Sequence, residues 1–373
     1  MATFNLPPCF ATINCANPEK ADMVMPANVV PQNPYKTQPE RAFWRASVGS
    51  RHYADLADIW HPMPLQKKDK IATAGSCFAQ HIGNNLGARG AAFMDMEPAP
   101  PLFRSAADAR RWGYGVFSCR YGNVYTTRQL IQLFDEAHGL RKPLEQVWEK
   151  NGRFYDSLRA SIDPVGQDSA EIVLKLRERH LAAVRRMFAE LDVFVFTMGL
   201  TEGWENTDDG TMFAVAPGTV AGTYDPARHR LNNLRHSDVL SDMVVFWKRL
   251  REVNANARML LTVSPVPLAA TATEHHVLVA TTYSKSVLRS VAGELSEEFE
   301  DIHYFPSYEI ISSHPARGMF FEADLRNVSM FGVDLVMNHF FSGSLAAEFG
   351  GKRENVDGEE IELICDESRL DRE

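Results

Sequence analysis

Ser76 is the residue whose type and setting best suit covalent chemistry. Residues 70–73 predict a short buried strand, and residues 77–86 repeat apolar side chains at helical spacing. A serine between a strand and a helix lies near backbone amides and a helix dipole, which stabilise the oxyanion formed in acyl transfer. Serine is also an ordinary helix cap, so the position alone leaves both roles open.

Cys77 is a rival nucleophile, because a thiolate is favoured at the N-terminus of a helix. Neighbouring side chains on a helix diverge by about 100°. If Ser76 faces a cleft, we therefore expect Cys77 to face the sheet as a small buried hydrophobe. His81, four residues further on, is expected on the helix surface rather than as a metal ligand.

Helices and strands alternate along the rest of the chain. The strand predicted at 192–197 is continuously apolar, as in a buried parallel sheet. This alternation predicts an α/β fold with a doubly wound parallel sheet. Ligands bind outside the carboxyl ends of such strands, so the loops at 75–76, 199–202 and 264–265 are expected along one edge. The other strands are predicted at 259–263 and 302–305, and the later helices at 127–138, 168–190, 237–253, 283–299 and 329–341.

Both ends of the chain differ from this central domain, which we place at residues 66–345. Residues 1–65 carry nine prolines and little periodicity, so we expect an extended N-terminal arm that wraps the core. Residues 346–373 form an acidic tail, and within it 352–373 hold nine acidic against four basic residues, a net −5. Such a tail is expected to be solvated, with partner binding as the alternative.

Composition excludes several classes of function. The net charge of −9 argues against affinity for nucleic acid or an anionic membrane. No apolar run approaches the roughly 18–20 residues of a membrane span and the N-terminus is unlike a signal peptide, so we expect a cytoplasmic protein. The five cysteines are scattered without CxxC spacing, and no glycine-rich phosphate loop is present. We therefore expect neither a metal nor a cofactor.

Five consecutive residues, Gly75-Ser76-Cys77-Phe78-Ala79, spell the motif of the GSCFA family, which lies near the SGNH (GDSL-like) hydrolases. The chain resembles this family from about residue 60 to residue 345, which is too long for a chance match. The resemblance implies a three-layer flavodoxin-like core with Ser76 as nucleophile. Its further blocks are RYGNVYT at 120–126, FTMGLTEGW at 196–204, TVSPVP at 262–267 and YFPSYEI at 304–310.

The resemblance also implies where an oxyanion would be bound. Gly122 with Asn123, and Gly199, stand where the superfamily draws its donors. The superfamily usually has Asn two residues after the second glycine, whereas this chain has Thr201, which can still donate a hydrogen bond. Glu202 could contact a substrate hydroxyl or be a solvated or capping residue.

The general base is the main departure from the superfamily. SGNH enzymes carry Asp-x-x-His before the last helix, and the matching residues here are Asp324 and Asn327. Asn cannot accept a proton from serine near neutral pH. Three explanations stay open: His314 supplies the base, the chain is an inactive form, or the alignment does not hold. Weaker candidates for the base are His275, His276, His303 and His339.

The resemblance thus implies an SGNH-type serine esterase or O-acyltransferase that forms an acyl-Ser76 intermediate. Its substrate would be a small-molecule or carbohydrate ester. The choice of an O-acylated carbohydrate rests only on what the superfamily commonly acts on. The alternative is a catalytically impaired binding protein on the same scaffold, because Asn327 replaces the expected histidine. A structural or assembly role has no signal beyond the two ends of the chain. The acyl group and the oligomeric state stay open.

Overall fold

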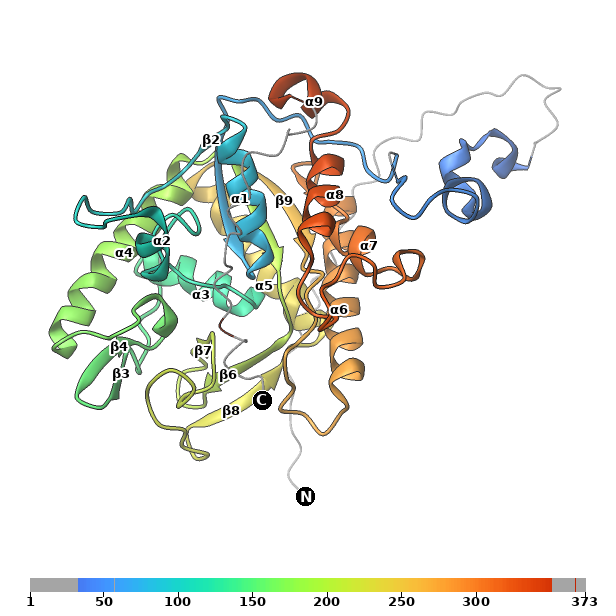
Figure 1. The fold of residues 1–373 in the computed structure, drawn as a ribbon. Coiled ribbons are helices and arrows are strands. Elements are labelled where there is room, and N and C mark those ends of the chain that lie inside the picture. The colour runs from blue at the N-terminus through green and yellow to red at the C-terminus, as the bar shows by residue number, and fades with distance from the viewer. Residues whose placement is uncertain (1–32, 57, 351–365, 367–373) are drawn as a thin grey trace, which may run out of the picture.

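Parallel strands form the central sheet of the protein (Figure 1). The computed structural model describes residues 33–56, 58–350 and 366. The sheet has five strands in the order β10-β9-β5-β1-β2, which is 2-1-3-4-5 when they are numbered among themselves and read from the β2 edge. That is the flavodoxin-like order, so the predicted fold class is confirmed. The strands are β1 (Lys70–Gly75), β2 (Ala92–Phe93), β5 (Val193–Met198), β9 (Arg258–Val263) and β10 (Ile302–Tyr304).

Helices cover both faces of the sheet and complete three layers (Figure 1). Successive side chains of a strand point to opposite faces, so Ile71 and Ala72 belong to two different apolar clusters. The Ile71 face is covered by α1 (Phe78–Ala88), α7 (Ser307–Ser312) and α8 (Met330–Phe340). The Ala72 face is covered by α3 (Thr127–Ala137), α4 (Ala170–Glu190), α5 (His236–Val253) and α6 (Val277–Glu298).

The boundaries of two helices show which local signals the sequence carries. Helix α3 begins with a capping box, in which Thr126 and Gln129 satisfy each other's backbone amides. Helix α6 begins at Val277, six residues before the predicted start at 283. Its first residues are rich in β-branched side chains, which weaken the helical pattern.

Smaller elements surround this core, and most of them are not predicted from the sequence pattern. A three-stranded antiparallel sheet follows β5 and lies on the side to which β1 points (Figure 1). Its strands are β6 (Glu202–Asn206), β7 (Met212–Phe213) and β8 (His229–Asn233), and β3 (Val147–Lys150) with β4 (Arg153–Asp156) forms a hairpin. Short helices are α2 (Ala106–Arg111) and α9 (Ser344–Phe349), with single turns at Pro34–Thr37, Glu40–Ala42, Arg45–Gly49, Ala160–Ile162 and His314–Ala316.

The predicted N-terminal arm joins the core at its C-terminal end. Trp60 meets Phe305 edge to face and stacks on Phe340, and its indole N–H donates to the carbonyl oxygen of His339 at 2.9 Å. Residues 1–32 and 57 of the predicted arm lie outside the described residues. In the described part of the chain, no helix is both long enough and apolar enough to cross a membrane.

Gly75 closes β1 in a conformation that other residues rarely adopt. Its φ is +136°, and it pairs with Thr197 of β5. A Cβ at this position would lie 2.7 Å from the Thr197 nitrogen and closer still to the Thr197 carbonyl oxygen. The two strands can therefore approach each other here only if residue 75 is glycine.

We predict that Gly75→Ala lowers stability by more than about 1 kcal/mol, because backbone strain adds to the clash with Thr197. Urea denaturation measures the change. Gly87→Ala is the matched control, since Gly87 is an exposed residue of α1 with no neighbour within 4 Å of the added carbon. It should leave stability unchanged or raise it by about 0.5–1 kcal/mol. Equal stability of the two variants would contradict the role of Gly75.

Candidate functional site

Ser76 lies where the strand order reverses, between β1 and β5, which is where ligands bind in this type of sheet. Its backbone N–H donates to the Thr197 carbonyl oxygen at 3.1 Å and fixes the turn. As predicted, the loops that follow β1, β5 and β9 meet at this edge. They enclose a small pocket lined by Ser76, Cys77, Tyr125, Gly199, Leu200, Ser264, Val266, Pro267, Leu268 and Lys285.

The Ser76 hydroxyl does not act as a helix cap. The N-cap of α1 is Cys77, and no side chain makes a capping hydrogen bond there. Ser76 is 3% exposed, yet its Oγ has no hydrogen-bond partner among the described residues. Buried polar atoms nearly always have a partner, so an exception calls for a functional explanation.

Lys285 of α6 is a buried lysine in the same pocket, 1% exposed. Its Nζ donates to the Gly199 carbonyl oxygen at 2.6 Å. A Cβ on Gly199 would lie 3.2 Å from the Ser76 Cβ, so Gly199 contacts both side chains. Sequence reasoning missed Lys285, although a signal exists: it shares the helix face of Leu288, Ala292 and Leu295, which are all buried.

Asn123, a predicted oxyanion donor, is buried and makes an unexpected contact. Its Nδ2 donates to Oδ2 of Asp366 at 2.9 Å, and the Asp366 backbone N–H donates to the Tyr125 hydroxyl at 3.2 Å. Asp366 is 2% exposed. The expectation of a solvated tail is therefore wrong at Asp366, since this carboxylate has exchanged water for an amide donor; residues 351–365 and 367–373 lie outside the described residues.

Both glycines expected near the oxyanion occupy constrained positions. Gly122 has a φ of +72°, and a Cβ there would lie 3.3 Å from Ile162. The Gly199 N–H donates to the Tyr125 carbonyl oxygen at 3.0 Å, so it is engaged within the protein. The oxyanion roles of Gly122, Asn123 and Gly199 stay predictions, and Asn123 is the one whose donor already faces a carboxylate oxygen.

Thr201 and Glu202 hold neighbouring loops and do not line the Ser76 pocket. The Thr201 hydroxyl donates to the Asn233 side-chain oxygen at 2.6 Å, which fastens β8. The Glu202 carboxylate accepts from the Thr271 hydroxyl at 2.7 Å and from the Ala272 amide at 3.3 Å. These bonds give both residues a structural role, and their contact with a substrate stays a prediction.

The predicted base region lies in the connection between α7 and α8. Asn327 donates from its Nδ2 to Asp324 at 2.6 Å, and both are exposed. Although burial opposes it, hydrogen bonds from Arg326 and Asn327 lower the pKa of Asp324. His314 is exposed and stacks on Trp44 with ring centroids 5.3 Å apart. None of these side chains hydrogen-bonds the Ser76 Oγ, so their roles stay predictions.

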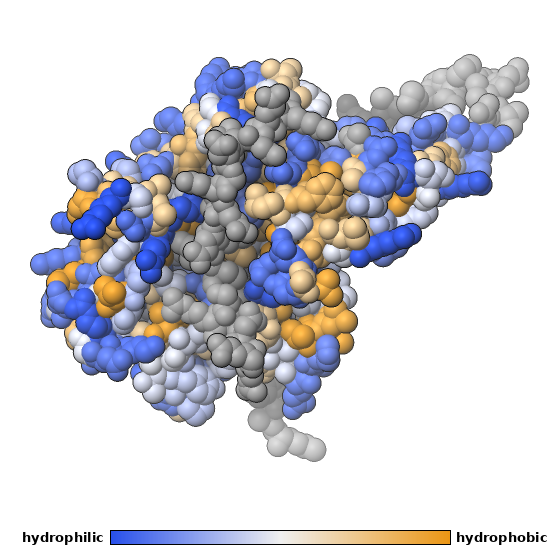
Figure 2. Space-filling model, in the orientation of Figure 1, coloured by the Kyte–Doolittle hydropathy of each residue, from blue (hydrophilic) through white to orange (hydrophobic). Residues whose placement is uncertain are grey.

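The same connection and the first turn of α8 carry exposed apolar side chains, and Figure 2 shows apolar surface beside α8. Large exposed apolar residues normally stand alone on a protein surface. Here several occur within a short stretch of chain: Met319, Leu325, Met330 and Phe331.

His81 and Cys77 are both buried. The expectation of a surface position for His81 is wrong, since α1 is enclosed on that side. Burial and the Arg110 charge lower the pKa of His81 to about 4, so the ring is neutral at pH 7. Cys77 lines the Ser76 pocket. Within the described residues, no group of three or more His, Cys, Asp or Glu side chains is placed to hold a metal ion.

A second, largely apolar pocket adjoins the Ser76 pocket. The two share Tyr125, Leu200 and Leu268 in their walls. The second pocket has a volume of about 170 Å³. A cavity of roughly this size holds a benzene-sized group. Its other walls are formed by Glu202, Gly203, Trp204, Ala214, Val215, Ala216, Leu231, Ala270, Thr271 and Ala272.

Comparison with known proteins bears directly on the serine motif. The sequence model of the GSCFA family matches residues 70–340, which include Ser76, Asn123, Gly199 and Lys285. The chain belongs to the GSCFA family. No curated protein matches it. A crystal structure from Parabacteroides merdae ATCC 43184, provisionally described as a GDSL-like lipase, covers 79% of this chain and 100% of its own, at 15% identity and a TM-score of 0.32. A likeness at that level supports no conclusion about activity.

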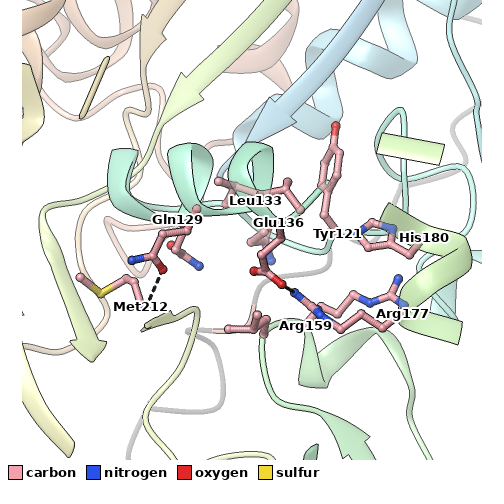
Figure 3. Close-up of a pocket in the computed structure, with 12 residues that line it drawn as sticks. Tyr121, Gln129, Leu133, Glu136, Arg159, Arg177, His180 and Met212 are labelled. Carbon is pink, nitrogen blue, oxygen red and sulfur yellow. Dashed lines mark hydrogen bonds and ion pairs between the residues drawn. The ribbon is translucent and has the colours of Figure 1, made fainter. Parts of the chain in front are cut away.

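A network of buried charges supports the Asn123 side of the GSCFA site. Asn123 lines a pocket together with Tyr121, Glu136, Arg159, Arg177 and His180 (Figure 3). Arg177 bridges Glu136 and Asp156, and Arg159 pairs with Asp156 at 2.7 Å. These paired charges stabilise the segment that carries Asn123, since Arg159 also donates to the Arg120 carbonyl oxygen at 2.9 Å.

Burial sets the protonation states in this network. It lowers the pKa of His180 to about 4, with help from the Arg159 charge and against the attraction of Glu97. For Asp156, burial alone would raise the pKa, but the charges of Arg177 and Arg159 lower it to about 2. At neutral pH, His180 is therefore neutral and donates to Glu97 at 2.7 Å.

We predict that acid destabilises this GSCFA protein, starting below pH 6.5. His81 and His180 are neutral in the folded state down to about pH 4, whereas in the unfolded state they bind protons from about pH 6.5. Each should remove on the order of 2 kcal/mol between pH 7.5 and pH 5. Denaturant titrations at both pH values measure this loss.

His180→Gln should make the loss smaller, because one of the two groups is gone. The matched control is His275→Gln at an exposed position, which should leave the pH dependence unchanged. The same pH dependence in both variants would contradict the assignment of His180.

Proposed function

We propose that this GSCFA protein is an SGNH-type serine esterase or O-acyltransferase that works through an acyl-Ser76 intermediate. One observation carries the proposal: the Ser76 Oγ is buried at the switch point of the sheet without a hydrogen-bond partner among the described residues, in a pocket that also holds Lys285. Family membership supports a hydrolase-like scaffold around this pocket.

The proposed reaction begins when the Ser76 Oγ attacks the ester carbonyl carbon and its proton passes to the Lys285 amine. The carbonyl oxygen becomes an oxyanion, which the Asn123 amide stabilises. The intermediate then expels the alcohol, which takes the proton from Lys285, and acyl-Ser76 remains. Water completes hydrolysis of the acyl group, or a second hydroxyl completes transfer.

Lys285 is the proposed base in place of His314, which was the leading candidate from the sequence. His314 is exposed and stacked on Trp44, whereas Lys285 shares the pocket of Ser76. An amine can accept a proton only in its neutral form, and burial favours the neutral form of such a group. A serine paired with a lysine is a known variant of the serine nucleophile arrangement.

The apolar pocket beside Ser76 supports an apolar acyl group in the substrate. Its walls include Leu200, Trp204 and Leu268, and its volume of about 170 Å³ suits a short aliphatic or a benzene-sized group. That the alcohol portion of the ester is a carbohydrate stays a prediction from the family resemblance. A cytoplasmic location stays a prediction from the sequence.

The second candidate function is ligand binding without turnover. It is favoured by Asn327, which bonds to Asp324 in an exposed loop and cannot serve as a base. This candidate predicts that Asn327→His creates ester hydrolysis in a protein that has none. Hydrolysis by the unaltered protein would exclude it.

We predict that Ser76→Ala abolishes labelling by a fluorophosphonate probe and lowers turnover of p-nitrophenyl acetate by several orders of magnitude, because the nucleophile is lost. The matched control is Ser296→Ala, which removes a hydroxyl bonded to its own helix α6. The control should label as fast as the unaltered protein. Labelling that survives in Ser76→Ala would overturn the proposed nucleophile.

We predict that Lys285→Met and Lys285→Arg both lower kcat about 10²- to 10⁴-fold. Arginine can still donate to the Gly199 carbonyl oxygen, but it cannot accept a proton near neutral pH. The pair therefore separates the two roles, since recovery of activity in Lys285→Arg would show that Lys285 is structural. Lys248→Met, at an exposed position of α5, is the control for loss of a lysine.

A further inference from the structure

We infer that Asn123 and Tyr125 form a carboxylate-binding subsite beside Ser76, and that the chain's own Asp366 is its ligand. Asp366 then competes with substrate for the site. The subsite itself stands on the contacts of Asp366, and only the competition rests on the proposed function.

The contacts of Asp366 define the subsite. The Asn123 amide donates to the Asp366 carboxylate at 2.9 Å, and the Tyr125 hydroxyl accepts the Asp366 backbone N–H at 3.2 Å. All three residues are at most 3% exposed. The site therefore grips one residue by both its side chain and its backbone, which favours an acidic residue within a peptide.

The segment that carries the subsite is held in place without Asp366. Val124, between the two residues, donates to the Gly75 carbonyl oxygen at 2.9 Å. The Tyr125 carbonyl oxygen accepts from Gly199 at 3.0 Å and from Leu200 at 3.2 Å. The segment thus spans the ends of β1 and β5, so the subsite is formed before its ligand arrives.

Hydrogen-bond donors also favour a carboxylate at this place. A buried carboxylate is costly unless donors compensate for its lost hydration. Asn123 supplies a donor, and the pocket that Tyr125 helps to line also contains the Lys285 amine, a second hydrogen-bonding group. Ester hydrolysis at Ser76 would release a carboxylate in the same place, so Asp366 resembles the product.

Asn123 links the subsite to catalysis. The N–H that points at the Asp366 carboxylate cannot point at a substrate oxyanion at the same time. An oxyanion that needs this N–H therefore competes with Asp366.

Hydrogen exchange tests the subsite without any need for activity. In the full chain with Ser76→Ala, adding Asp366→Ala should speed exchange in residues 121–126. Asp371→Ala removes the same charge from the same region of sequence and is the matched control, with no change expected. Sodium acetate should restore protection in the Asp366→Ala chain and have no effect on the Asp371→Ala chain. Equal exchange in the Asp366→Ala and Asp371→Ala chains would overturn the subsite.

Kinetics then test the competition, with Ser76 intact. Asp366→Ala should raise kcat/KM for p-nitrophenyl acetate about fivefold or more, the change expected when a contact of this kind is lost. Acetate should inhibit this variant more strongly than the unaltered chain. Unchanged kcat/KM together with unchanged inhibition by acetate would overturn the competition. If the alanine variant folds poorly, Asp366→Asn, which keeps the shape of the side chain, gives the same test. Absence of turnover in every chain would count against the proposed function, while hydrogen exchange would still decide the subsite.

Discussion

The close approach of β1 and β5 at Gly75 and Thr197 is the constraint on which the site depends. It leaves no room for a Cβ at residue 75, and it turns the chain sharply before Ser76. The Thr197 carbonyl oxygen then accepts a hydrogen bond from the Ser76 amide. Gly199, which follows the last residue of β5, lies against the Ser76 side chain. Since Gly199 in turn accepts from Lys285, one contact between two strands sets the positions of both groups that the proposed reaction needs.

The polar groups of the site divide into those with internal partners and those without. Thr201 and Glu202 form hydrogen bonds with neighbouring segments, and the Gly199 amide donates to the Tyr125 carbonyl oxygen. The Ser76 hydroxyl has no partner among the described residues, although it is buried. Because Ser76 lies at the switch point of the sheet, where ligands bind in this type of fold, its open hydroxyl is placed to react with a ligand bound there.

Much of the fold could be predicted, because its signals are local. The apolar run at 192–197 predicts β5, and the helix predicted at 127–138 matches α3, without knowledge of distant contacts. Ser76 could be found for the same reason, since a strand, a glycine and a helix are adjacent in the sequence. Lys285 was missed because helical periodicity treats a lysine as solvent-facing, and His81 was misplaced because burial of α1 depends on elements more than 200 residues away, such as α8. The strands β6 and β8 are rich in polar residues and β7 has only two residues, so only their pairing reveals them.

The position of Asp366 could not be predicted from local sequence patterns. Burial of its carboxylate also needs a physical explanation, because removing a carboxylate from water is unfavourable. Its contact with Asn123 joins residues 243 positions apart, and composition alone favours a solvated tail. A carboxylate leaves water only when a formed site repays the loss of hydration. The segment 123–125, tied to Gly75 and Gly199, is such a site. The hydrogen bonds that hold the segment of Asn123 in place for an oxyanion therefore also allow it to bind an acidic residue. A preorganised site of this kind binds an internal carboxylate for the same physical reason that it would stabilise a transition state.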